Sequence, residues 1–313
     1  MEAVMSRLDA PARALFAGKP GSMAAWLKAF RIHQWSKNAL VLAPVALGWH
    51  GVATTGIAAA VVAMLLLCGV ASLTYCVNDI ADIEADRAHA TKRNRPFASG
   101  ALSVRQGLAV CGLGIPALII CGAILSPAIG VWLAAYTAIT LAYSFGLKRI
   151  PILDTVIIGA LFTVRIILGT VAAHLAPSAW LLTFSMFFFY SLATAKRHTE
   201  LLRAGETSSG QIKGRGYNVE DKEVTFAFGI VASVASILIM VLYLVDDVFP
   251  RALYVHPEWL WAMPLAIFLW VGRIWLLAHR GSMADDPVVF ALRDRVSLYL
   301  GAVMGVAFVL ALL

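Results

Sequence analysis

Residues 56–77, GIAAAVVAMLLLCGVASLTYCV, contain no charged side chain, and residues 78–100, NDIADIEADRAHATKRNRPFASG, follow them directly. A helix that crosses a bilayer needs about 20 mostly apolar residues, so the first stretch predicts a transmembrane helix. The second stretch places four acids and then five Arg, Lys or His side chains at the mouth of that helix. Such a density of charge at a membrane boundary indicates a site for charged ligands.

The rest of the chain has the same apolar character. It has 313 residues, of which 60% are hydrophobic and 14% charged, whereas soluble domains are about half apolar. Backbone groups inside a bilayer must be hydrogen-bonded internally, which favours an all-α polytopic membrane helix bundle. Nine transmembrane helices are predicted, at 38–55, 57–77, 105–124, 128–146, 152–171, 178–195, 223–245, 258–278 and 296–313.

Residues 1–37 are predicted to form a cytoplasmic N-terminal segment, and residues 38–313 a single transmembrane catalytic domain. Within the N-terminal segment, Met23, Trp26, Leu27 and Phe30 recur at helical spacing in MAAWLKAF. This pattern predicts an amphipathic helix that lies in the membrane interface.

Basic residues indicate the orientation. We assign every Lys and Arg except Arg165 and Arg251 to one set of loops or its flanking helix ends. Cytoplasmic loops carry the excess of Lys and Arg, so this set is predicted to be cytoplasmic. We therefore expect a protein of the bacterial inner membrane whose active site faces the cytoplasm.

This orientation predicts that a single cysteine in place of Ser209 stays unlabelled by an impermeant thiol reagent in intact cells, because the loop at 196–222 is inside. A cysteine placed in the loop at 246–258 should be labelled under the same conditions. Labelling at position 209 instead would reverse the topology.

The acids after the second span share one face of a helix. At about 100° per residue, Asn78, Asp79, Asp82 and Asp86 fall within a stripe roughly 100° wide, while Glu84 points away. Carboxylate and amide oxygens suit Mg²⁺, which also bridges to phosphate oxygens. The alternative is a solvated cap at a helix end.

The cations that follow are typical of phosphate recognition, since Arg offers a planar fork of donors and Lys a point charge. The alternative is anchoring or contact with lipid headgroups. These residues are Arg87, His89, Lys92, Arg93 and Arg95.

NDIADIEADRAHATKRNRP resembles the first signature of the UbiA superfamily of intramembrane prenyltransferases, and more narrowly its decaprenyl-phosphate phosphoribosyltransferase-like branch. Further matches are RIHQWSKN, YSFGLKRIPILD, LATAKRHTEL and DDPVVFALRDR. Ala90 stands where that branch usually has proline. Many aromatic prenyltransferases of the superfamily carry a second acidic motif after the sixth span, and here Lys196, Arg197, His198 and Glu200 occupy that place.

The resemblance implies a UbiA-like fold and Mg²⁺-dependent transfer of 5-phosphoribosyl from phosphoribosyl pyrophosphate to polyprenyl phosphate. It implies Asn78, Asp79, Asp82 and Asp86 as metal ligands, and contact with membrane lipids. A separate phosphatase is expected to act on the product, and no nucleic-acid partner is expected. The implied substrate-binding residues are Gln34, Lys37, Asn38, Asn78, Arg87, Lys92, Arg93, Arg95, Tyr143, Lys148, Asp154, Lys196, Arg197, Glu200, Arg293, Asp294 and Arg295.

Three other functions fit parts of the pattern. A UbiA-type enzyme that alkylates an aromatic or other small acceptor with prenyl diphosphate is the nearest, but it favours two acidic motifs rather than one acidic and one basic. An anion or lipid transporter would place its charges near the bilayer midplane instead of at the mouth. A non-catalytic lipid-binding protein would not need the acidic stripe.

Overall fold

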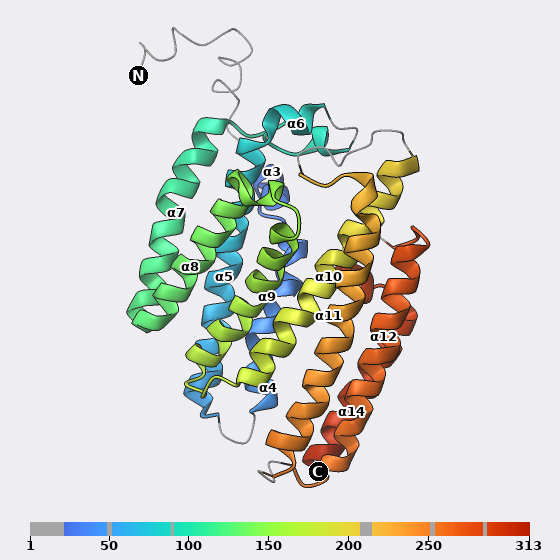
Figure 1. Cartoon of the computed structure of the whole chain (residues 1–313). Helices are drawn as coiled ribbons and strands as arrows, with labels where there is room; N and C mark the ends of the chain where they lie inside the picture. Colours follow the sequence, from blue (N-terminus) through green and yellow to red (C-terminus); the bar gives the residue numbers. More distant parts are fainter. Residues whose placement is uncertain (1–21, 49–51, 89–90, 207–214, 251–253, 284–286) are drawn as a thin grey trace, which may run out of the picture. The chain divides into compact units, whose positions relative to one another are not determined.

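The computed structural model describes residues 22–48, 52–88, 91–206, 215–250, 254–283 and 287–313. The chain divides into two compact units. Unit 1 comprises Met1–Phe145 and Arg165–Ala176, and unit 2 comprises Gly146–Val164 and Pro177–Leu313. The elements of the described residues are helical, which confirms the all-α prediction (Figure 1).

Unit 1 is built around a long helix that carries the opening stretch of sequence. This helix, α5, is followed by the short α6 and then by α7 and α8, two further apolar helices. Ser103 begins α7 by accepting a hydrogen bond from the Gln106 N–H at 3.2 Å. The elements are α3 (Met23–Ala29), η1 (Ile32–Leu42), α4 (Ala43–Leu47), α5 (Thr54–Ala81), α6 (Ile83–Arg87), η3 (Lys92–Asn94), α7 (Val104–Leu125) and α8 (Pro127–Phe145).

The N-terminal helix exists, but its apolar residues do not all face one way. Ser22 caps α3 by accepting from the Ala25 N–H. Trp26 and Phe30 pack on a buried cluster that includes Phe97, whereas Met23 and Leu27 remain exposed. Two of the four residues of the predicted interfacial face therefore pack against the core of unit 1.

The prediction of an α-helical span at 38–55 is not confirmed. Residues Ile32–Leu42 form the 3₁₀ helix η1, and Ala43–Leu47 form only a short α-helix. Pro44 has no N–H and stands at the start of α4, where the missing donor is tolerated, so it separates the two segments.

Unit 2 contains the first part of α9 and four other long helices. Ser191 of α10 hydrogen-bonds Ser233 at 2.7 Å and donates to the Gly229 carbonyl of α11, so small polar residues join these helices. The elements are η4 (Leu147–Arg149), α9 (Leu153–Ala172), α10 (Ala179–Glu206), η5 (Val219–Asp221), α11 (Lys222–Tyr243), the π-helical turn η6 (Leu244–Val248), η7 (Pro257–Trp261), α12 (Ala262–His279), α13 (Pro287–Ala291) and α14 (Arg295–Leu312).

Among the described residues, seven helical segments are long and apolar enough to cross a membrane, and they coincide with seven of the nine predicted spans. The segment predicted at 178–195 is also a helix, α10, but its charged C-terminal half makes it more polar. The protein is thus an integral membrane protein, and the count of nine spans is not confirmed.

Candidate active site

The acidic cluster of unit 1 consists of Asp79, Asp86, Arg31 and Arg95. Asp79 ends the apolar part of α5 and is 1% exposed, and Asp86 of α6 is 3% exposed. Arg95 Nη1 lies 3.1 Å from Asp79 Oδ1 and 2.7 Å from Asp86 Oδ2. Arg31 Nη2 donates to the same Asp79 oxygen at 2.5 Å. Two nearly buried carboxylates are therefore neutralised by two half-buried guanidinium groups.

The helix that carries the acidic stripe is interrupted. Asp82 separates α5 from α6 with φ −98° and ψ 12°, so the stripe does not lie on one continuous helix. Asp82 and Asn78 are half-buried, and Glu84 is exposed. The interruption still leaves Asp79 and Asp86 convergent and Glu84 on the solvent side.

The acidic cluster fits a divalent cation bound together with phosphate. In the described part of the chain, no group of three or more His, Cys, Asp or Glu side chains could hold a metal ion by itself. Mg²⁺ is usually held by one or two carboxylates plus waters and substrate phosphates. Asp79 and Asp86 meet this requirement, because oxygens of both already converge on one cationic nitrogen of Arg95.

Arg31 was missing from the sequence-predicted site, although it begins the RIHQWSKN stretch. Its backbone adopts φ 49° and ψ 49°, which is uncommon for a residue other than glycine. Its guanidinium also lies over the ring of Tyr75, 5.0 Å from the centroid. The left-handed turn between α3 and η1 thus brings a cation to Asp79.

The remaining candidates of unit 1 do not all reach the acidic cluster. Arg87 is exposed and donates from Nε to the Ala98 carbonyl at 2.9 Å. Lys92 and Arg93 are exposed on η3. Half-buried candidates are Gln34 and Lys37 of η1 and Tyr143 near the end of α8.

Asn38 belongs to a separate buried network. Its Oδ1 accepts from Arg165 Nε at 2.9 Å, and its Nδ2 donates to Cys68 Sγ at 3.3 Å. Arg165 also donates to the Tyr136 hydroxyl at 3.1 Å. A charge inside a span needs such partners, so Asn38 acts in the packing of unit 1 rather than beside Asp79.

In unit 2, Asp154 at the start of α9 is fully buried and accepts from three side chains. Arg197 Nη2 lies 2.9 Å from its Oδ2, and Arg215 Nη1 lies 3.1 Å from the same oxygen. The Tyr217 hydroxyl donates to Oδ1 at 2.6 Å. Arg197 is itself fully buried and forms a second ion pair with Glu200. We refer to these five residues as the Asp154 cluster.

The Asp154 cluster attaches the segment before α11 to the start of α9. Tyr217 also accepts from the Ile152 N–H at 2.7 Å. Burial raises the pKa of Tyr217, and its hydrogen bond to the Asp154 carboxylate raises this pKa further. Tyr217 therefore acts as a neutral donor. Arg215 and Tyr217 were not predicted, because nothing in their spacing connects them with Asp154.

Two further cations of the predicted site lie in unit 2. Lys196 is half-buried beside Arg197 on α10, and Lys148 is half-buried on η4. Arg197 has both carboxylate partners inside its own cluster. Arg197 is consequently occupied within the Asp154 cluster.

The Asp294 carboxylate has a structural role. It caps α14 by accepting from the Ser297 N–H at 2.8 Å, and it forms a two-pronged ion pair with Arg273 at 2.5 and 3.0 Å. Partial burial alone would raise the pKa of Asp294, but the hydrogen bonds from Arg273 and Ser297 lower it below the ordinary 3.8. The neighbouring Arg293 and Arg295 are exposed.

Asp294→Ala is expected to lower the free energy of unfolding by about 1–2 kcal/mol through loss of the cap and the charged hydrogen bonds. The exposed Arg295→Ala should cost much less. Because the folded-state pKa is lowered, the contribution of Asp294 is complete above its ordinary value and is lost as the pH falls through the lowered one. Thermal unfolding of detergent-solubilised protein should show a constant difference at about pH 5 to 7. A difference that disappears in this range would contradict the assignment.

Several residues of the motifs lie outside the part of the chain that the structure describes. They are His89 and Ala90 of the first motif, and Asp285 and Asp286, the first two residues of DDPVVFALRDR; Ser209, the position of the labelling test, also lies outside it.

Long apolar helices with charge clusters at their ends define a polytopic helical membrane protein. The chain belongs to the UbiA prenyltransferase family, whose sequence pattern matches residues 39–295. The predicted family resemblance is thereby confirmed.

Several bacterial relatives cover much of the chain. It is 44% identical to the uncharacterized protein y4nM of Sinorhizobium fredii over 92% of the chain and 56% of y4nM, so it spans little more than half of that protein. It is 32% identical to nodulation protein NoeC of Azorhizobium caulinodans, over 91% of the chain and 93% of NoeC. It is 39% identical to decaprenyl-phosphate phosphoribosyltransferase of Mycolicibacterium smegmatis, over 62% of each protein.

Solved structures confirm the fold. A structure of digeranylgeranylglyceryl phosphate synthase matches with a TM-score of 0.66 and 14% identity, over 92% of this chain and 98% of that one. A UbiA homolog from Archaeoglobus fulgidus, bound to GPP and Mg²⁺, matches with a TM-score of 0.60 and 11% identity, over 91% and 97%. At these identities the likeness concerns the fold alone.

Proposed function

We propose that this protein transfers the 5-phosphoribosyl group from phosphoribosyl pyrophosphate to a polyprenyl phosphate. The observation that carries the proposal is the contrast between the acidic motif of α5 and α6 and the basic residues that stand in place of a second acidic motif on α10. Unit 1 offers convergent carboxylates for a metal-bound diphosphate. On α10, where an aromatic prenyltransferase would carry a second acidic motif, Lys196 and Arg197 stand instead, and Glu200 is paired with Arg197.

This charge pattern supports a ligand set with one metal-bound diphosphate and further phosphates bound without metal. Phosphoribosyl pyrophosphate carries both kinds of group, and a polyprenyl phosphate adds another anion. The 39% identity to a decaprenyl-phosphate phosphoribosyltransferase supports the same substrates. We further propose that residues 38–313 act as one catalytic domain with the reaction on the cytoplasmic side of the bacterial inner membrane.

In the proposed reaction, an oxygen of the lipid phosphate attacks C1 of the ribose as the bond from C1 to the diphosphate oxygen breaks. The diphosphate leaves with the bonding electrons, and attack from the opposite face inverts C1. A phosphate monoester is largely dianionic at pH 7, since its second pKa is about 6, so no general base has to remove a proton. The product keeps its 5-phosphate, which a separate phosphatase would remove.

Asp79 and Asp86 would hold Mg²⁺, with Asp82 and Asn78 as further candidate ligands. When bound, the ion supplies positive charge that stabilises the departing diphosphate. Arg31 and Arg95, already beside these carboxylates, would bind diphosphate oxygens. Arg87, Lys92, Arg93, Lys148 and Lys196 are proposed to orient the anionic substrates and offset their repulsion.

The decisive experiment supplies purified protein with radiolabelled phosphoribosyl pyrophosphate, polyprenyl phosphate and Mg²⁺. A labelled product that partitions into organic solvent, and that requires both the lipid phosphate and the metal, is expected. A parallel reaction offers prenyl diphosphate and 4-hydroxybenzoate. Alkylation of that acceptor without phosphoribosyl transfer would replace the proposal with aromatic prenyl transfer.

A further inference from the structure

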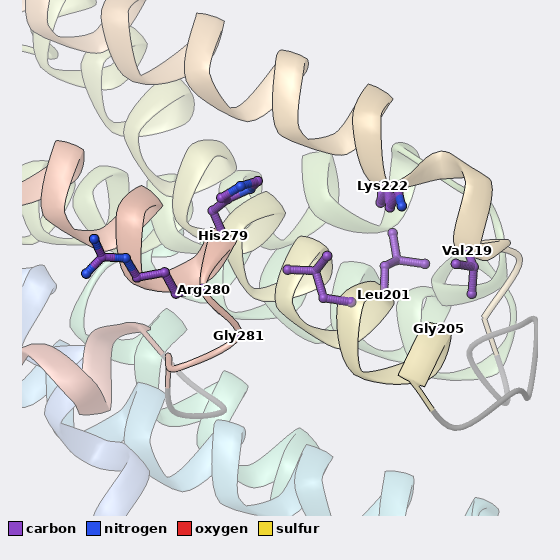
Figure 2. A pocket seen from close by; sticks show the side chains of 8 residues that line it. Leu201, Gly205, Val219, Lys222, His279, Arg280 and Gly281 are labelled. Carbon is purple, nitrogen blue, oxygen red and sulfur yellow. The ribbon is translucent and has the colours of Figure 1, made fainter.

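Unit 2 contains a cleft that the proposed reaction does not use. It has a volume of about 420 Å³ and lies at the ends of α10 and α12 and the start of α11 (Figure 2). None of its eight described lining residues belongs to the Asp154 cluster. They are Leu201, Leu202, Gly205, Val219, Lys222, His279, Arg280 and Gly281.

The polar side chains of this cleft favour an anion. Lys222 at the start of α11 and His279 at the end of α12 are both exposed, and none of the described lining residues is acidic. Figure 2 shows the Arg280 side chain extending away from Lys222, so we assign ligand contact to Lys222 and His279.

A buried imidazole supports both of these residues. His198 is 3% exposed, and its Nδ1 bonds the Lys222 carbonyl at 3.0 Å. Its ring stacks on that of His279 with centroids 6.0 Å apart and planes 8° apart. Its Nε2 is buried without a hydrogen-bond partner among the described residues. His198 therefore holds the two anion-binding residues in place.

The apolar surroundings favour a lipid over a free phosphate. Leu201, Leu202 and Val219 line the cleft. The exposed Phe226 lies one turn after Lys222, and its ring centroid is 5.4 Å from that of His279. Leu276, 47% exposed, lies one turn before His279. An anion held at Lys222 and His279 would thus have exposed apolar surface beside it for acyl chains.

We propose that this cleft binds the phosphate headgroup of an anionic membrane lipid, separately from the substrates of the transfer reaction. Basic pockets between membrane helices bind such headgroups by charge and hydrogen bonds. The phosphate would accept from Lys222 and His279, while the acyl chains would follow Phe226 and Leu276. The ligand class is a phospholipid with a net negative headgroup, such as phosphatidate.

The test titrates the purified protein in detergent with phosphatidate and, separately, with phosphatidylcholine, which should bind more weakly, and counts bound lipid by native mass spectrometry. Tight binding of one phosphatidate is expected. Lys222→Ala should raise the dissociation constant for phosphatidate at least about tenfold, since a charge-assisted contact is lost. Leu202→Trp, which fills the cleft without changing charge, should also weaken binding. The matched control is Arg105→Ala, because Arg105 is an exposed cation on α7 outside the cleft.

Thermal unfolding of each variant first establishes that it is folded. Unchanged phosphatidate affinity in folded Lys222→Ala and Leu202→Trp would overturn the site. An equal loss of phosphatidate affinity in Arg105→Ala would show that the lipid binds by general electrostatic attraction, which would also overturn the site. If inorganic phosphate competes as strongly as phosphatidate, the cleft binds soluble phosphate compounds and the lipid assignment is wrong.

Discussion

Asp82→Asn is expected to lower the rate of phosphoribosyl transfer by at least about a hundredfold, whereas Glu84→Gln should change it less than about threefold. The metal contributes several kcal/mol of stabilisation to a departing anion, and each 1.36 kcal/mol corresponds to a factor of about ten in rate. The two residues lie two positions apart, and neither is buried, so neither change should affect folding much. This makes them a matched pair.

The measurement is the initial rate as a function of Mg²⁺ concentration, with both substrates saturating. Asp82→Asn should also raise the Mg²⁺ concentration that gives half-maximal rate, and Glu84→Gln should leave it unchanged. Equal losses in the two variants would show that Asp82 has no special part in metal binding. The same series with Asp86→Asn tests the buried carboxylate beside Arg95.

Asp154→Ala is expected to destabilise the protein by about 3–5 kcal/mol, since it leaves a buried guanidinium without its main partner. Arg197 would keep Glu200 as a carboxylate partner, and Arg215 and Tyr217 would lose an acceptor. The thermal unfolding midpoint in detergent provides the measurement. Glu200→Gln, which changes a side chain 29% exposed, should cost clearly less and serves as the control.

A double variant distinguishes a structural role of Asp154 from a role in substrate binding. Replacing a buried ion pair by apolar residues of similar size is often neutral or stabilising, so Asp154→Leu with Arg197→Met should recover much of the lost stability. If Asp154→Ala instead keeps the wild-type unfolding midpoint and loses only activity, Asp154 binds substrate and the structural assignment fails.

The transmembrane spans could be predicted because the ends of each long apolar run mark the ends of its helix. The predicted 105–124 and 128–146 differ by one residue at each end from Val104–Leu125 and Pro127–Phe145. Hydropathy could not exclude 38–55, since it is insensitive to Pro44 and to 3₁₀ hydrogen bonding. The turn at Asp82 was likewise invisible, because no proline or glycine marks it.

The sequence indicated which charged residues gather at the helix ends, but it did not indicate which residue each of them pairs with. The motif predicted that Asp79 and Asp86 act together, and the structure brings their oxygens to one nitrogen of Arg95. The sequence also indicated a phosphate-binding role for Arg197, whereas its complete burial between Asp154 and Glu200 favours a structural one. Such pairings depend on tertiary contacts between residues 43 positions apart, which local spacing does not encode.

The guanidinium of Arg95 between two carboxylates bears on how the protein can be purified. Domains with a structural metal site commonly unfold on chelation, because the bound ion supplies part of their folding free energy. Here Arg31 and Arg95 neutralise Asp79 and Asp86 without one. Extraction and affinity chromatography in EDTA should therefore yield folded protein, which regains activity when magnesium is restored.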